Sequence, residues 1–226
     1  MPKTTPFHNC LAPYNETGIW KHWSGYLVAP RYQYSTIAEY YAIRNSVAIL
    51  DTSPLFKYRI SGPDALRFLQ SVMVRDIGQC KIGDAQYTCW CNSDGFVLQD
   101  GVILRISDDN FRLTAGEPSL HYFRATASTL DLSNLEIEDL TNDYGILAVQ
   151  GPHAYSTISQ LTDATDSLSY FELAQTEIEG SPVLLSRTGY TGDLGYELWI
   201  KAEDADRIWQ CLISAGHDYN VIPIGL

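Results

Sequence analysis

The 226-residue sequence has little positive charge, few cysteines and no long apolar run. Fifteen Lys and Arg stand against 27 Asp and Glu, so the formal net charge is −12. Nucleic acids and anionic membranes are bound through clusters of Lys and Arg, so neither is an expected partner. No stretch approaches the roughly 18 consecutive apolar residues that a membrane span needs. The first ten residues also lack the apolar segment of a secretory signal.

The cysteines are few and odd in number: Cys10, Cys80, Cys89, Cys91 and Cys211. An odd count without a secretory signal favours reduced thiols in the cytoplasm over a disulfide framework. Cys89 and Cys91 share one face of a predicted strand, but no second Cys or His pair at ligand spacing follows, and structural zinc needs four ligands. We therefore expect buried strand cysteines and no metal site.

The apolar content is high enough for a folded core, because 45% of the residues are hydrophobic and 19% are charged. Apolar periodicity predicts helices over 36–47, 63–73, 118–130, 152–161 and 203–214. Alternation and turn residues predict strands over 48–50, 56–60, 86–91, 101–106, 111–114, 135–140, 146–149, 176–178, 183–186 and 196–200. Strands joined by hairpins with helices inserted between them indicate an α+β fold with mixed, largely antiparallel sheets.

The densest local pattern runs from Ser186 to Leu198 and contains Gly189, Gly192 and Gly195. Three glycines at a spacing of three do not match the dinucleotide pattern, and a strand rather than a helix follows them. A nucleotide phosphate loop is therefore excluded. One interpretation is a glycine-rich hairpin whose glycines supply positive φ angles.

A second interpretation of this pattern depends on Glu197, which interrupts the apolar strand 196–200. Alternation places Glu197 on the same strand face as Trp199. A carboxylate in such a place must find hydrogen-bond donors or stay hydrated. A ligand with two adjacent N–H groups would satisfy it through both oxygens.

Another polar pattern lies in the hairpin 92–104, where Gln99 and Asp100 precede Gly101. The pair marks either a kink or bulge in a strand or a set of polar groups at the mouth of a pocket.

The run from Arg187 to Glu197 resembles the signature of the aminomethyltransferase (glycine-cleavage T-protein) family of tetrahydrofolate-binding proteins. Further segments resemble motifs of this family in the same order: 44–53, 60–65, Ala148-Val149-Gln150-Gly151-Pro152 and 222–226. Together they cover nearly the whole chain. Each motif alone would be weak, but the series indicates membership of the family.

The resemblance implies the folate-binding aminomethyltransferase-like fold, a cloverleaf of three domains. Residues 1–53 and 150–226 would form a discontinuous, incomplete first domain that binds folate, and 54–149 the second. The third, C-terminal barrel domain would be absent from this chain, because family members are longer. We therefore expect an incomplete cloverleaf, C-terminally truncated, that binds folate weakly or not at all and could be inactive by itself.

The resemblance also implies tetrahydrofolate as the cofactor and assigns residues to it. Glu197 would bind the amino and ring N–H groups of the pterin. Tyr190 and Tyr87 would line the folate channel, and Leu55 would stand at the pocket wall. Arg187, in the same signature, is a further candidate for cofactor binding.

The candidate catalytic residues, Gln99 and Asp100, depart from the family pattern, which has two Asp here. The first of those carboxylates is assigned to catalysis in the family. Gln99 can orient a group but cannot take up a proton. Neighbours in a regular strand face opposite sides, so Asp100 could replace the missing acid only if the strand bulges near Gly101.

The predicted function is that of a tetrahydrofolate-dependent one-carbon transferase that resembles aminomethyltransferase. Its partner would be a small-molecule methyl or aminomethyl donor, with a lipoyl carrier protein as well if it is a true T-protein. An alternative is a tetrahydrofolate-dependent S- or O-demethylase of the same family, because a methyl on a good leaving group needs a well-positioned N5 and little help from a base. A second alternative is a non-catalytic folate-binding protein that assists iron–sulfur maturation.

Overall fold

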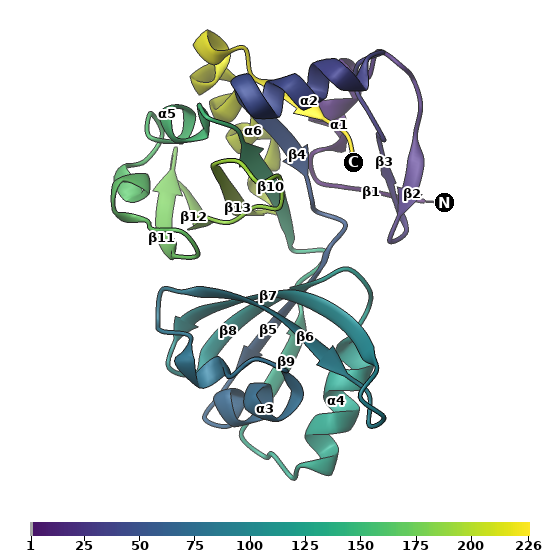
Figure 1. Cartoon of the computed structure of the whole chain (residues 1–226), viewed down its shortest axis with the longest axis vertical. Coiled ribbons are helices and arrows are strands. Elements are labelled where there is room, and N and C mark those ends of the chain that lie inside the picture. The colour runs from purple at the N-terminus through teal and green to yellow at the C-terminus, as the bar shows by residue number, and fades with distance from the viewer. Residues whose placement is uncertain (1) are drawn as a thin grey trace. The chain divides into compact units, whose positions relative to one another are not determined.

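The structure is a computed structural model that describes residues 2–226 and divides into two compact units (Figure 1). Unit 1 consists of the residues through Pro54 together with Asp143–Leu226, and unit 2 is Leu55–Asn142. The return to unit 1 thus falls at 142–143 and not at the predicted 149–150. The reason is that β10 (Tyr144–Gln150) pairs on both sides with strands of unit 1. Within 2–226, no helix is long and apolar enough to cross a membrane.

Unit 1 is built on a six-stranded sheet of order β11-β12-β13-β10-β4-β14. Besides β10, its strands are β4 (Ala48–Asp51), β11 (Leu173–Ile178), β12 (Ser181–Ser186), β13 (Gly195–Lys201) and β14 (Ile222–Ile224). A smaller sheet contains β1 (Lys3–Thr4), β2 (Lys21–Trp23) and β3 (Tyr26–Val28). The helices are α1 (His8–Leu11), α2 (Thr36–Asn45), α5 (Ala154–Ile158) and α6 (Ala205–Ala215), with 3-10 turns at Ala12–Tyr14, Asp163–Ser167, Ala202–Asp204 and His217–Tyr219. All pairs in the large sheet are antiparallel except β14 with β4.

The two faces of this sheet bury different residues, as the period of two in a strand requires. On one face Tyr196 and Leu198 of β13 join Val149 of β10 and Trp209 of α6 in the main core. On the other face, where α2 lies, Ala148 belongs to a smaller cluster of Ala42, Ala48, Leu50, Ala148 and Ile224. The strands of this sheet thus bury apolar side chains on both faces. Each large side chain that is fully buried contributes about 1.5–3 kcal/mol to the stability of the fold.

Buried Glu39 of α2 connects three parts of unit 1 that are distant in sequence. Its Oε1 accepts hydrogen bonds from the backbone N–H groups of Tyr32 at 2.6 Å and Gln33 at 2.9 Å. Its Oε2 accepts from the N–H of Gly225 at 2.9 Å, just after β14. Gly225 lies so close to the backbone of Pro30 that a Cβ there would approach within 3.0 Å. A single carboxylate therefore holds the N-terminal arm, α2 and β14 together.

Unit 2 is a five-stranded antiparallel sheet of order β6-β7-β8-β5-β9. Its strands are β5 (Phe56–Ser61), β6 (Ala85–Cys91), β7 (Val97–Ser107), β8 (Asn110–Ala115) and β9 (Glu136–Asp139), and its helices are α3 (Ala65–Val72) and α4 (Leu120–Thr129), with a 3-10 turn at Ile77–Gln79. Phe123 of α4 makes edge-on ring contacts with Tyr58 and Phe68 at the centre of this core.

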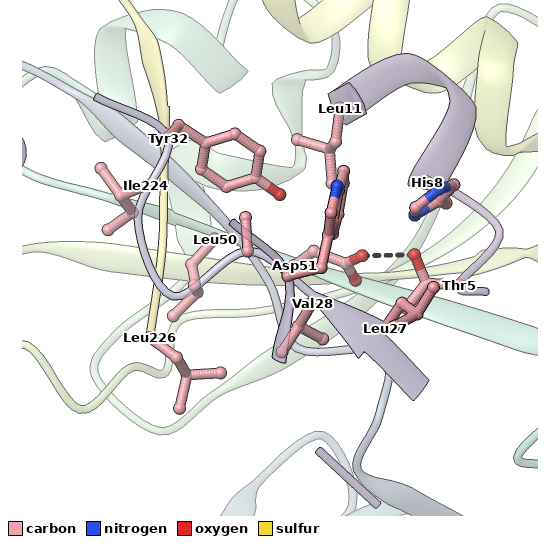
Figure 2. A pocket seen from close by; sticks show the side chains of 12 residues that line it. Thr5, His8, Leu11, Leu27, Val28, Tyr32, Leu50, Asp51, Ile224 and Leu226 are labelled. Carbon is pink, nitrogen blue, oxygen red and sulfur yellow. Dashed lines mark hydrogen bonds between the residues drawn. The ribbon is translucent and has the colours of Figure 1, made fainter. Parts of the chain in front are cut away.

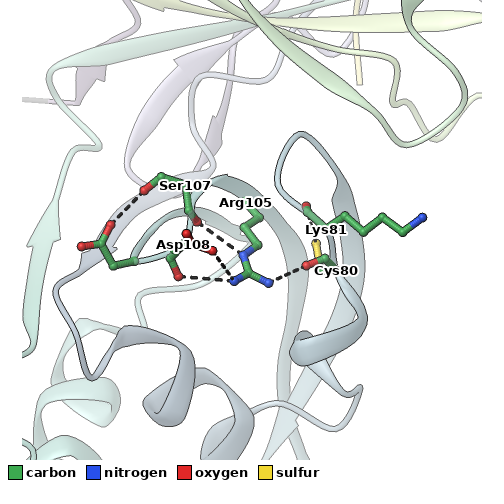
Figure 3. Close-up of polar contacts among 6 residues, drawn as sticks. Cys80, Lys81, Arg105, Ser107 and Asp108 are labelled. Atoms are coloured by element: carbon green, nitrogen blue, oxygen red, sulfur yellow. Dashed lines mark hydrogen bonds and ion pairs between the residues drawn. The ribbon is translucent and has the colours of Figure 1, made fainter.

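Arg105 is a buried cation that ties together the turns at one end of the unit 2 sheet (Figure 3). Its Nη1 donates to the carbonyl of Cys80 at 2.8 Å, and its Nε donates to that of Ser107 at 3.4 Å. The guanidinium also lies 5.4 Å from the ring centre of Phe111. Because buried charge needs partners, Arg105 is satisfied by carbonyl oxygens and one exposed carboxylate, that of Asp108 at 3.6 Å.

The predicted α+β fold with mixed, largely antiparallel sheets is confirmed. Most predicted elements are present. The strand predicted over 101–106 already begins at Val97, because the polar residues Gln99 and Asp100 also pair with β6. The helix predicted over 152–161 is reduced to Ala154–Ile158. Strand β14 was missed, since three residues with a central Pro show no alternation.

Candidate functional site

Glu197 lies in an interior strand of the unit 1 sheet. It is paired with Ala148 of β10 on one side and with Ser186 of β12 on the other. The predicted alternation is confirmed, because Tyr196 and Leu198 point into the main core. Glu197 is half-buried on the opposite face.

The Glu197 carboxylate is held by a short chain of hydroxyl groups. The hydroxyl of Thr188 donates a hydrogen bond to Glu197 Oε2, and Ser186 Oγ lies 2.7 Å from Thr188 Oγ1. Both hydroxyl residues are buried. Burial raises the pKa of Glu197 above its ordinary value, and the hydrogen bond from Thr188 opposes that rise. Within 2–226, Thr188 is thus the donor that favours the ionised form of Glu197.

Tyr190 stands beside this carboxylate in the glycine-containing loop. Its side chain is 64% exposed. Loss of hydration around the hydroxyl and the charge of Glu197 raise the pKa of Tyr190 to about 12. The structure thus brings two of the predicted cofactor-binding residues together.

Gln150, which is not among the site residues predicted from the sequence, supports this loop through hydrogen bonds. Its Nε2 donates to the carbonyl of Thr188 at 3.4 Å, and its Oε1 accepts from the hydroxyl of Thr191 at 2.8 Å. A Cβ on Gly189 or Gly195 would lie closer than 3.0 Å to the Gln150 side chain. Gly192 alone of the three signature glycines has a positive φ, +78°. The other two are therefore explained by close packing rather than by turn conformation.

Arg44 fixes the outer end of the same loop. Its Nη1 pairs with Asp193 Oδ2 at 2.6 Å, and its guanidinium lies 5.4 Å from the ring centre of Tyr40 on the same helix. The segments 44–53 and 148–152, singled out for their resemblance, thus meet the loop through Arg44 and Gln150. Beyond the motifs themselves, no local pattern in the sequence indicates these contacts.

Arg187 makes a different set of contacts. Its Nη1 donates to the carbonyl of Leu168 at 2.9 Å. Burial in the main core raises the pKa of Tyr196, and the charge of Arg187 opposes that rise. Its Nε is buried without a hydrogen-bond partner among the described residues. Arg187 therefore holds the residue that follows the Asp163–Ser167 turn, and within 2–226 it forms no hydrogen bond or ion pair with Glu197.

The candidate catalytic residues lie in unit 2, on β7. Gln99, Asp100 and Gly101 pair in regular register with Trp90, Cys89 and Thr88 of β6, and the irregularity falls between Trp90 and Cys91. There is thus no bulge against β6 at Gly101. Gln99 and Asp100 consequently face opposite sides of the sheet.

Each of these two residues has its own surroundings. Asp100 Oδ2 accepts a hydrogen bond from the hydroxyl of Tyr87, another predicted site residue. Gln99 Oε1 accepts from the backbone N–H of Asp100 at 2.9 Å, and its amide lies against Gly116. Leu55 is half-buried before β5, and its carbonyl accepts from the buried Lys57 ammonium at 2.8 Å. The side chains of Tyr87 and Asp100 are therefore brought together, whereas the Gln99 side chain bonds to the backbone of Asp100 and the Leu55 carbonyl bonds to Lys57.

A small cavity of unit 1 lies between the N-terminal arm and β4 (Figure 2). Asp51 accepts a hydrogen bond from Thr5 at 2.6 Å, and Tyr32, His8 and Leu226 also line the space. Its volume of about 10 Å³ suits one water molecule rather than a cofactor. Within residues 2–226, no group of three or more His, Cys, Asp or Glu could hold a metal ion.

Comparison with known proteins gives consistent results. The model of the GCVT N-terminal domain matches residues 8–226. The chain is 34% identical to an aminomethyltransferase of Anoxybacillus flavithermus over 86% of its length and 54% of the relative. It is 32% identical to that of Exiguobacterium sibiricum over 99% of its length and 60% of the relative. The chain therefore spans just over half the length of the curated relatives it matches.

Solved structures show the same fold. Glycine cleavage system aminomethyltransferase T from Bartonella henselae is superposable with a TM-score of 0.86 at 21% identity, over 100% of this chain and 60% of that one. A chain of the heterotetrameric sarcosine oxidase from Corynebacterium gives a TM-score of 0.63 at 16% identity, over 95% of both chains. With the family model matched over nearly all of its residues, the chain belongs to the aminomethyltransferase (glycine-cleavage T-protein) family, through its GCVT N-terminal domain.

Proposed function

We propose that the protein is a tetrahydrofolate-dependent one-carbon transferase. The observation that carries this proposal is the Glu197 carboxylate, which a donor holds at Oε2 on an interior strand of a chain from this family. The curated relatives are named aminomethyltransferases, which supports transferase chemistry. Tetrahydrofolate is the acceptor that the sequence resemblance implies.

The surroundings of Glu197 fit the pterin end of a folate. A pterin presents an amino group beside a ring N–H, and an ionised carboxylate accepts from two such donors. Within 2–226, Thr188 is the hydrogen-bond partner of this carboxylate, so acceptor sites on both oxygens stay open. The exposed ring of Tyr190 offers an aromatic surface nearby. When bound, tetrahydrofolate would supply N5 as the atom that receives the one-carbon unit.

The residues of unit 2 bear on which donor is used. We propose that Tyr87 and Leu55 contact the folate and that Gln99 or Asp100 acts at the reacting group, as the resemblance implies. Gln99 can donate and accept hydrogen bonds but cannot carry a proton. Asp100 faces the other side of β7, where its carboxylate accepts a hydrogen bond from the hydroxyl of Tyr87. Release of ammonia from an aminomethyl group needs a proton carrier. Gln99 therefore favours, as a second candidate function, methyl transfer from an S- or O-methyl donor.

Binding can be tested by NMR titration of the 226-residue chain with tetrahydrofolate under anaerobic conditions, since NMR also detects weak binding. We expect the amide signals of 188–197 to shift. Glu197→Gln should weaken binding at least tenfold, because a hydrogen bond to a charged group contributes about 1.5–3 kcal/mol. Glu177→Gln, on the exposed side of β11, is the matched control and should bind like the unaltered chain. Unchanged binding by Glu197→Gln would contradict the proposal.

The reaction type is tested by the product formed from tetrahydrofolate and candidate donors. 5-Methyltetrahydrofolate would identify a demethylase, and 5,10-methylenetetrahydrofolate an aminomethyltransferase, with a lipoyl carrier protein as its expected partner. Binding that depends on Glu197 without turnover of any donor would favour the non-catalytic, iron–sulfur-related alternative.

A further inference from the structure

Ser186, Thr188 and Glu197 form a chain of hydrogen bonds. The direction of these bonds follows from the number of hydroxyl protons in the chain. Each hydroxyl has one proton to donate. Because Thr188 donates to Glu197, the contact of 2.7 Å between Ser186 and Thr188 must have Ser186 as donor when Glu197 is ionised. The order Ser186 to Thr188 to Glu197 thus points every proton toward the carboxylate.

Strand pairing places two of the three side chains opposite each other. Ser186 is the β12 residue opposite Glu197 of β13. Thr188 follows two residues later, and its carbonyl accepts from Gln150. The Thr188 backbone is therefore held by a buried side chain while its hydroxyl holds the carboxylate.

The arrangement treats the two carboxylate oxygens differently. Oε2 receives the Thr188 hydrogen bond. Oε1 has no hydrogen-bond partner within 2–226 and is not fully buried, so solvent or a ligand can reach it. A carboxylate held at one oxygen keeps a fixed orientation of the other.

From this geometry we propose that Thr188 is a positioning residue: by holding Oε2 it stabilises the ionised Glu197 side chain and directs Oε1 toward the N–H donors of a ligand. The identity of that ligand, a folate, rests on the proposed function. The positioning itself does not. Tyr190 is a titratable group whose charge interaction with Glu197 is evident in the described chain. Of the cations nearby in sequence, Arg187 contacts the carbonyl of Leu168, and Lys201 pairs with Glu203.

The test uses the ¹³C carboxyl signal of Glu197, identified by its loss in Glu197→Gln and titrated with pH without ligand. Thr188→Val removes the hydroxyl at nearly constant volume. The midpoint should rise by about one pH unit, which is a tenfold change in the ratio of ionised to protonated carboxyl. Thr188→Ser restores the donor and should return the midpoint to within a few tenths of a unit. Ser186→Ala leaves Thr188 free to donate and should give a smaller rise.

The same variants separate the two proposals. If the chain binds tetrahydrofolate, Thr188→Val should bind it more weakly at neutral pH and recover part of the affinity at higher pH, whereas Thr188→Ser should not differ. A midpoint unchanged in Thr188→Val would overturn the positioning role, whatever the folate result. A shifted midpoint in a chain whose tetrahydrofolate binding is unchanged by Glu197→Gln would overturn the proposed function and leave the positioning role standing. If Thr188→Val does not fold, Thr188→Ala provides the same measurement.

Discussion

Arg44 and Asp193 are 149 residues apart in the sequence and form an ion pair of 2.6 Å that closes the outer end of the signature loop. Arg44 belongs to α2, and Asp193 lies between the last two signature glycines. The side chains are 37% and 27% exposed, so water and salt partly screen the pair. The contact orders the loop more than it stabilises the fold.

A double-mutant cycle of Arg44→Ala and Asp193→Ala checks this view. We expect a small coupling energy that decreases as the salt concentration rises. Both single variants should speed hydrogen exchange at the amides of 190–193, measured by NMR. Coupling that is independent of salt would show that the pair is shielded from solvent and contradict this account.

Replacement of Gln150 by Leu should destabilise unit 1 by about 1–3 kcal/mol, because the Thr188 carbonyl and the Thr191 hydroxyl each lose a partner inside the protein. Urea unfolding measures the loss. Gln175→Leu is the matched control, since Gln175 is exposed on β11, and it should change the stability by less than about 0.5 kcal/mol. Equal effects of the two substitutions would show that Gln150 does not support the loop.

Gly101→Ala should destabilise unit 2, because a Cβ there would lie closer than 3.0 Å to the backbone carbonyl of Thr114. Overpacking against backbone of this kind costs about 1–3 kcal/mol. Gly116→Ala is the control in the same unit, because the atoms nearest to its Cβ would be those of the Gln99 amide at an ordinary distance of 3.6 Å. Thermal unfolding should show a lower midpoint for Gly101→Ala alone.

The Tyr87 phenol should ionise at higher pH than a free tyrosine. Its hydrogen bond to Asp100 raises the pKa of Tyr87, with smaller contributions from desolvation and from the Asp100 charge. Asp100→Asn removes the charge and weakens the bond, so the phenolate should then form at lower pH. Ultraviolet difference titration measures this step, which Tyr87→Phe identifies by abolishing it. The pair would be absent in solution if Asp100→Asn left the Tyr87 step unchanged.

Much of the fold could be predicted because the local patterns agree with the tertiary structure. Alternation placed Glu197 opposite the core, and the turn residues of 107–110 marked the β7–β8 hairpin. The bounds of α5 and the short β14 could not be predicted, because a few residues do not carry a complete period. Arg187 resembles a site residue in sequence, yet its contact is a carbonyl of a neighbouring turn.

The sequence by itself determined the family, the α+β class and Glu197 as the candidate site carboxylate, because motifs and strand periodicity are local properties of the chain. Only the tertiary structure decided what holds that carboxylate and why the glycines are there. Thr188 reaches Glu197, and Gln150 packs against Gly189 and Gly195, across strand pairings and turns that no local pattern specifies. The same holds for Gln99 and Asp100, whose opposite orientation follows from the regular register of 99–101 with 88–90 of β6.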